Sequence, residues 1–235
     1  MEIYRATLEN CGNETDTVIV IDVLRAFTTA AVAFAKGVYE IVLASSVEEA
    51  FNLRGRFPDA HIMGEVNGYP VEGFDFGNSP SALSLHDLAG KRLIQRTTAG
   101  TQGIVRSANA RSVFATGLCT VSATVDRVLR LSPQSVTLVQ TGVFPGGWGD
   151  EDVACADLIE AKINGRNLSA EEIKQRVRQS KSGMHYLNAN HDVFPSADLD
   201  AALQIDRFDF AMSVAREDGA LILRPEKLGG RITAR

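Results

Sequence analysis

The feature that most constrains the fold is the apolar run VIVI at residues 18–21, which ends at a carboxylate and is followed by a helical pattern. Four β-branched residues without polar alternation are typical of a strand buried on both faces of a parallel sheet. Asp22 then lies at the end of that strand, and Arg25 lies in the turn that follows. Ligands of open α/β sheets bind beyond the carboxyl ends of the strands, so Asp22 and Arg25 are predicted to lie at the rim of a site. The alternative is that Asp22 only caps the next helix and pairs with Arg25 at the surface.

Strand and helix patterns alternate along most of the chain. Further strands are predicted at residues 39–44, 61–64, 92–96, 112–115, 135–140 and 220–223, and capping boxes begin at Ser46 and Ser169. The segment from the second capping box to Ala215 is predicted to be mainly helical. We therefore expect a three-layer α/β/α fold with a largely parallel, possibly mixed sheet. Residues 1–235 are expected to form a single domain, with one candidate lobe boundary near Gly165.

Charge and cysteine usage limit the possible partners and compartment. A formal net charge of −5 argues against nucleic acid or an anionic membrane as the partner. The three cysteines are widely spaced and odd in number, which fits a reducing compartment better than a disulfide framework. The first residues contain no apolar leader, and no run reaches transmembrane length, so we expect a cytoplasmic protein. A homo-oligomer remains open.

Polar or glycine-rich segments follow four of the predicted strands. These segments are Asp22 to Arg25, Glu65 with the loop to Asn78 and Ser79, residues 97–103, and the acidic residues 150–152. Parallel strands would bring them to one edge of the sheet. The turn TTAGT at residues 97–101 precedes a helix, where free N–H groups favour a phosphate, although it could be a simple capped turn.

Side chains in these segments suggest a metal site with an anion beside it. Asp22, Glu65, Glu151 and Asp152 would supply oxygen ligands for Mg²⁺, unless the 150–152 acids only favour the start of a helix. Arg25 and Arg96 could balance a phosphate and a second anionic group. Thr28, one turn beyond Arg25, joins the candidate substrate-binding residues.

Several other chemistries are excluded by their missing motifs. The DxDx[TV] motif of haloacid-dehalogenase phosphatases is absent because Leu24 stands at its second acidic position. No cysteine has the arginine that a cysteine phosphatase requires, and the chain lacks a P-loop, a GxSxG elbow and a GxGxxG fingerprint. His185 and the pair His191-Asp192 are interpreted as structural or peripheral rather than as metal ligands.

Four segments in this order resemble the 2-phosphosulfolactate phosphatase family. They are VIVIDVLRAFTT (18–29), GEVNGYPVEGFDFGNSP (64–80), RTTAGTQGI (96–104) and GDEDVACADLI (149–159), and the resemblance extends from about residue 18 to residue 206. The resemblance implies a Mg²⁺-dependent hydrolase that removes phosphate from 2-phospho-3-sulfolactate in coenzyme M synthesis. It also implies functional roles for Asp22, Arg25, Glu65, Asn78, Ser79, Thr97, Thr98, Gly100, Thr101, Glu151 and Asp152. One departure is Ala99, where the family pattern has Asn.

The expected activity is therefore Mg²⁺-dependent hydrolysis of a small anionic phosphoester. Direct attack by water is favoured because no nucleophilic motif is present, and an Asp22 nucleophile remains open. Two other classes remain open as well. One is a binding or sensor protein for small anions, and the other is a metal-assisted lyase acting on a phosphorylated hydroxy acid.

Overall fold

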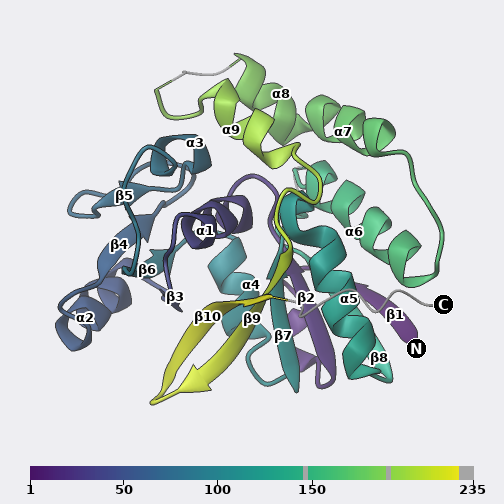
Figure 1. Cartoon of the computed structure of the whole chain (residues 1–235), viewed down its shortest axis with the longest axis horizontal. Helices are drawn as coiled ribbons and strands as arrows, with labels where there is room; N and C mark the ends of the chain where they lie inside the picture. Colours follow the sequence, from purple (N-terminus) through teal and green to yellow (C-terminus); the bar gives the residue numbers. More distant parts are fainter. Residues whose placement is uncertain (145–147, 189–191, 228–235) are drawn as a thin grey trace.

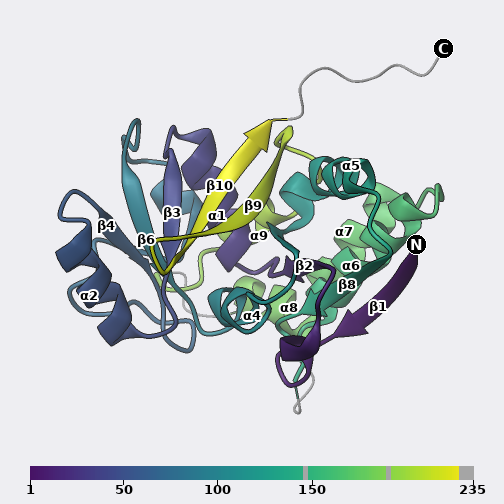
Figure 2. The same ribbon diagram turned by 90° about the horizontal axis from the view of Figure 1, so that it is seen from below.

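The computed structural model describes residues 1–144, 148–188 and 192–227, and within them ten strands form one curled sheet with helices on both faces (Figures 1 and 2). The strands are β1 (Glu2–Ala6), β2 (Thr17–Ile21), β3 (Glu40–Leu43), β4 (His61–Gly64), β5 (Phe76–Gly77), β6 (Arg92–Arg96), β7 (Ser112–Thr116), β8 (Ser135–Gln140), β9 (Phe210–Glu217) and β10 (Ala220–Lys227). The helices are α1 (Ala26–Ala35), α2 (Val47–Arg56), α3 (Pro80–Leu83), α4 (Gly100–Arg106), α5 (Val121–Leu131), α6 (Asp150–Ile163), α7 (Ala170–Gln179), α8 (Lys181–Asn188) and α9 (Ser196–Ala202).

The sheet consists of two parallel blocks joined by an antiparallel hairpin. Its strand order is β1-β8-β2-β7-β9-β10-β3-β6-β4-β5. Strands within the first block (β1, β8, β2, β7) are parallel, as are those within the second (β3, β6, β4, β5). The hairpin β9–β10 pairs antiparallel with β7 on one side and with β3 on the other. The predicted α/β/α class and the possibility of a mixed sheet are both confirmed.

The curl of the sheet brings the two blocks together at one place. Three antiparallel pairings separate the blocks, so their strands run in opposite directions. In a flat sheet the carboxyl ends of β2 and β6 would therefore lie at opposite edges. Adjacent strands twist by about 20–25°, and this twist accumulates between the blocks. The Nε2 of Gln95 in β6 donates to the carbonyl oxygen of Ala26 at the start of α1 over 3.0 Å, so the two ends meet around the beginning of this helix.

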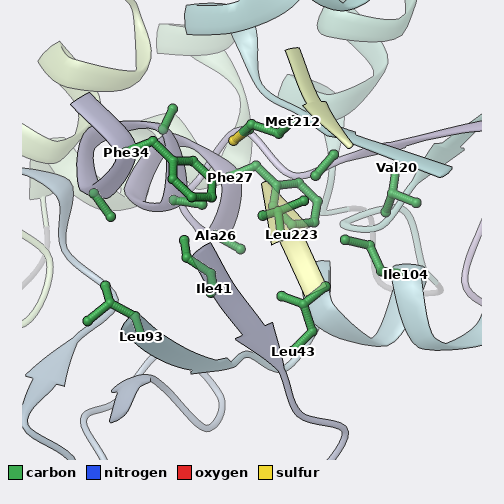
Figure 3. Packing of buried hydrophobic residues seen from close by; sticks show 14 of the residues in the cluster. Val20, Ala26, Phe27, Phe34, Ile41, Leu43, Leu93, Ile104, Met212 and Leu223 are labelled. Atoms are coloured by element: carbon green, nitrogen blue, oxygen red, sulfur yellow. The ribbon is translucent and has the colours of Figure 1, made fainter. Parts of the chain in front are cut away.

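Helix α1 fills the space between the blocks. It is apolar on every side, and all its residues from Ala26 to Phe34 are buried, as expected for a helix inside a core. Phe27 and Phe34 share one hydrophobic cluster with Ile41 of β3 and Leu93 of β6 (Figure 3). Burying a side chain of this size stabilises the fold by roughly 1.5–3 kcal/mol. The packing fixes the turn before α1, where Asp22 lies.

Strand β2 is buried on both faces, as the unbroken apolar run predicts. Val18 and Val20 belong to the cluster around α1. Ile19 and Ile21 face the opposite cluster, which includes residues of α5 and α6. A third cluster lies under α2 in the second block.

Most predicted elements are present, with three differences. The helices predicted to start at Ser46 and Ser169 are confirmed, and each serine accepts the N–H three residues later. The Glu49 carboxylate accepts the N–H of Ser45 rather than that of Ser46. The predicted helix up to Ala215 is wrong at its end, because residues 210–217 form β9. Strands β1 and β5 were not predicted. No helix in the described residues is long and apolar enough to cross a membrane.

Candidate active site

A pocket of about 370 Å³ opens where β2, β4, β6 and β8 end. Six predicted site residues line it: Asp22, Arg25, Glu65, Asn78, Thr98 and Glu151. We call this the acid pocket. A larger cavity of about 690 Å³ shares the wall formed by Arg25, Gly68 and Asn78, but it contains none of the four predicted metal-binding acids. The acid pocket is therefore the candidate active site.

Asp22 lies at the floor of the acid pocket with only 7% of its surface exposed. Its Oδ1 accepts the N–H of Ala26 at 2.9 Å, so the helix-capping part of the alternative interpretation is present. The surface pairing with Arg25 is not present, because both residues are buried and Arg25 pairs elsewhere. Burial, followed by the nearby charges of Glu65 and Glu151, raises the pKa of Asp22 to about 7, against the opposing effect of backbone hydrogen bonds from Ala26 and Gly100.

Glu65 is held in place by the backbone that follows β4 and β6. Its carboxylate accepts the N–H and the hydroxyl of Thr98, at 2.5 and 2.9 Å, and the N–H of Gly68 at 2.5 Å. The hydroxyl of Thr98 also accepts the N–H of Asn67 at 2.7 Å. These bonds fix the carboxylate at the pocket wall and join the loop after β4 to the loop after β6.

Glu151 and Asp152 start α6 but have different surroundings. The loop before α6 folds back at Gly149, where φ is +97° and a Cβ would lie 2.3 Å from the backbone of Gly142. Asp152 accepts the N–H of Val23 at 3.0 Å and that of Gly142 at 2.8 Å. Asp152 thus ties two loops together and does not line the pocket. Glu151 does line it, and its Oε2 is buried without a hydrogen-bond partner in the described part of the chain.

Burial dominates the titration of these two acids. It raises the pKa of Glu151, against hydrogen bonds from its own backbone and from Ser182. It also raises the pKa of Asp152 well above its usual value, with further contributions from the charges of Glu151 and Asp22. Neighbouring carboxyl groups whose pKa values are all raised in this way lack a compensating cation.

Arg25 is the one lysine or arginine in the described lining of the acid pocket, and it is already paired. Its guanidinium donates to Asp198 at 2.8 Å, to the Val193 carbonyl at 2.9 Å and to the Gly68 carbonyl at 3.2 Å. The rings of Tyr186 and Phe194 lie 5.3 Å from its carbon Cζ. Three of its five N–H groups therefore face protein acceptors.

The turn predicted to bind phosphate instead binds carboxylates and hydroxyls of the protein. The N–H groups of Thr97 and Thr101 are paired with each other's hydroxyl groups, at 2.9 and 3.0 Å. The Thr98 N–H is taken by Glu65, and the Gly100 backbone bonds to Asp22. These four donors are thus not open to an external anion. The turn contributes to the site by orienting two of its acids.

Three further predicted residues, Thr28, Ser79 and Arg96, lie around the pocket rather than in it. Thr28 is buried and donates to the Val23 carbonyl. Ser79 caps α3 and donates to Asp198, and Arg96 donates to the Glu65 carbonyl over 2.7 Å. Asn78 does line the pocket, and its Oδ1 is buried without a hydrogen-bond partner in the described chain.

An aromatic wall that the sequence did not predict lines the same pocket as the acids. It consists of Phe144, Trp148, His185, Tyr186 and Phe194. His185 was interpreted as peripheral, but its ring lies 4.5 Å from that of Phe194 and lines the pocket. Asp192 lines the larger cavity instead, and His191 lies outside the described residues. The glycine-rich loop after β8 was the only sequence signal for this wall.

The four predicted metal-binding acids do not form a closed ligand set. Within the described residues, no group of three or more His, Cys, Asp or Glu side chains is arranged to hold a metal ion by itself. Both oxygens of Glu65 and both of Asp152 accept N–H or hydroxyl groups of the protein, whereas Asp22 and Glu151 line the pocket and the Oε2 of Glu151 has no partner in the described chain. Two carboxylates with open coordination positions suit Mg²⁺, which usually keeps several waters and shares its substrate's phosphate oxygens. The unpartnered oxygens of Glu151 and Asn78 fit the same hard cation.

The geometry defines a class: an α/β protein with an acidic pocket where strands from two sheet blocks end. A family model described as 2-phosphosulpholactate phosphatase matches residues 4–216. The chain belongs to this family, which is one of phosphoric monoester hydrolases.

Individual relatives carry the same description. A probable 2-phosphosulfolactate phosphatase of Bacillus subtilis is 35% identical over 205 residues, which is 87% of this chain and 89% of the relative. One from Cyanothece is 28% identical over 90% of this chain and 93% of the relative. One from Carboxydothermus hydrogenoformans is 39% identical over 66% of this chain and 63% of the relative.

Proposed function

We propose that this chain is a Mg²⁺-dependent phosphatase that hydrolyses a small anionic phosphoester in the acid pocket. The observation that carries the proposal is the group Asp22, Glu65 and Glu151, buried in one pocket whose described lining has Arg25 as its one lysine or arginine, and Arg25 is paired with Asp198. Uncompensated buried carboxylates are costly, and a bound divalent cation would remove most of that cost.

Each pocket residue has a role that its contacts support. Asp22 and Glu151 would hold Mg²⁺, and Glu65 would stay in place through Thr98. When bound, the ion would supply positive charge to the phosphoryl oxygens as negative charge develops on them. The other N–H groups of Arg25 would bind phosphoryl oxygens at the opposite wall. Arg25 is well fixed for this, because Asp198 and two carbonyls hold its guanidinium.

The first substrate to test is 2-phospho-3-sulfolactate, because the relatives are named as probable phosphatases of that compound. Its hydrolysis to sulfolactate and phosphate would place the chain in coenzyme M synthesis. Direct attack by water is favoured because the sequence contains none of the phosphatase nucleophile motifs considered above, and an Asp22 nucleophile remains the alternative.

A phosphate-release panel tests the proposal. Purified protein is incubated with 2-phosphosulfolactate, 2-phospholactate and p-nitrophenyl phosphate, each with Mg²⁺ and after exhaustive chelation. We expect phosphate release that disappears on chelation and returns with Mg²⁺. Full activity after chelation would refute the metal dependence. Binding of these anions without release would instead favour a binding protein, and an organic product other than the free alcohol would indicate a lyase.

A further inference from the structure

His185 lies between the acid pocket and an open surface groove. It is half-buried in α8, and its ring lies 4.5 Å from that of Phe194 and 5.8 Å from that of Trp148. The same side chain lines both the acid pocket and a groove of about 400 Å³ that includes Asp150 and Lys181. Within the described residues its contacts are with aromatic rings, and no hydrogen bond to its ring nitrogens is found. The imidazole is thus positioned by packing against aromatic rings.

The proposed reaction needs a proton donor in this pocket, so this inference rests on the proposed function. Cleavage of an alkyl phosphoester leaves a strongly basic alkoxide, which departs readily only if a proton reaches its oxygen. Arg25 does not give up its proton, and burial raises the pKa of the Tyr186 hydroxyl. Asp22 and Glu151 would be engaged with the cation. His185 is the one imidazole among the described residues of the pocket lining.

We propose that His185 is the general acid of the reaction and protonates the leaving oxygen of the substrate. As the bond between phosphorus and that oxygen breaks, a ring N–H of the imidazolium gives its proton to the oxygen, and the product leaves as a neutral alcohol group. Water supplies the new oxygen of inorganic phosphate, and its displaced proton goes to solvent. The neutral imidazole then regains a proton from solvent through the surface groove.

The dependence of the rate on the leaving group tests this assignment. Wild type and His185→Asn are compared on 2-phospholactate, which has an alkoxide leaving group, and on p-nitrophenyl phosphate, whose nitrophenolate needs no proton. Loss of a general acid lowers the rate by about 10²–10⁴-fold only where the leaving group is basic. We expect a kcat loss of that size on 2-phospholactate and less than about 5-fold on p-nitrophenyl phosphate. Added imidazole should restore part of the activity of His185→Ala on the alkyl substrate.

A matched control and the other outcomes keep the assignment falsifiable. His86→Asn removes an imidazole that packs against Phe76 in the larger cavity, and it should leave both rates near wild type. Equal losses on both substrates in His185→Asn, with an unchanged thermal midpoint, would overturn the proposal, because they would indicate a role in binding. Unchanged rates on both would overturn it as well. A wild-type protein without phosphatase activity would refute the proposed function itself, which a selective loss in one variant cannot mimic.

Discussion

At the scale of single residues, a substitution of Asp22 distinguishes a catalytic role from a purely structural one. Asp22→Asn keeps an oxygen that can accept the Ala26 N–H but removes the charge. If Asp22 holds the cation, turnover should fall by about 10²-fold or more, the scale expected when a catalytic electrostatic group is lost. Phosphate release with saturating Mg²⁺ measures this. Asp126→Asn on the exposed side of α5 is the control and should retain full activity. Near-normal turnover in Asp22→Asn would end the catalytic assignment.

The raised pKa of Asp22 also predicts how the stability of the metal-free protein depends on pH. A carboxyl whose pKa is about 7 in the folded state binds protons more tightly than in the unfolded state. Its contribution to the free energy of unfolding is therefore fully present below its unfolded pKa near 4 and is lost as the pH rises through 7. The pKa values of Glu151 and Asp152 are raised as well, so these two groups contribute with the same sign.

Urea unfolding in chelator measures this effect. The free energy of unfolding should be lower at pH 8 than at pH 5 by a few kcal/mol, since each unit of pKa shift corresponds to about 1.4 kcal/mol. Asp22→Asn should show a smaller decrease and be at least as stable as wild type at pH 8. A pH-independent stability would show that these acids are not strained in the metal-free protein. The pKa of Asp157 is lowered in the folded protein, so this residue changes the stability only at more acidic pH.

At the scale of elements, the first position of α4, Gly100, is predicted to be intolerant of any side chain. A Cβ on Gly100 would lie 2.7 Å from both Oδ2 of Asp22 and Cβ of Ala26. Gly100→Ala should therefore displace Asp22, lower turnover by about 10-fold or more, and cost roughly 1–3 kcal/mol of stability. Gly55→Ala in α2 is the matched control, because no atom lies within 4 Å of its Cβ position. It should gain about 0.5–1 kcal/mol with unchanged turnover. Urea unfolding measures the stability of both variants, and phosphate release measures their turnover. Near-normal turnover in Gly100→Ala would contradict the prediction.

Elements with strong local patterns could be predicted from the sequence, and those that depend on distant partners could not. The apolar run of β2 and the capping box at Ser46 each carry their own signal. Residues 210–217 contain alanine and methionine, which favour helix, yet they form β9 because β7 and β10 offer partners on both sides. For the site, the order of polar segments after the strands located Asp22 and Glu65. Which carboxylate oxygens are taken by backbone N–H groups depends on loop packing that the sequence does not show.

At the scale of the whole molecule, the acid pocket depends on the curl of the sheet. Asp22 and Glu151 follow strands of the first block, whereas Glu65 and Thr98 follow strands of the second. A purely parallel sheet would place these segments at one edge. In this protein the hairpin β9–β10 lies between the blocks, so their strands run in opposite directions. The segments still meet in one pocket because the sheet curls around α1 (Figure 1).

Mg²⁺ should therefore stabilise the whole protein. A ligand that binds only the folded state adds about 2.7 kcal/mol at a concentration of 100 times its Kd. For a chain of this length, 1 kcal/mol raises the thermal midpoint by roughly 2–4 °C, so Mg²⁺ should raise it by about 5–10 °C. Calorimetry at constant ionic strength, with sodium chloride replacing the magnesium salt, measures the shift. Asp22→Asn should lose most of it, because its metal-free form is already relieved of a buried charge and binds the cation weakly. A shift of equal size in wild type and Asp22→Asn would place the stabilising ion elsewhere on the molecule and remove the support for a metal site in the acid pocket.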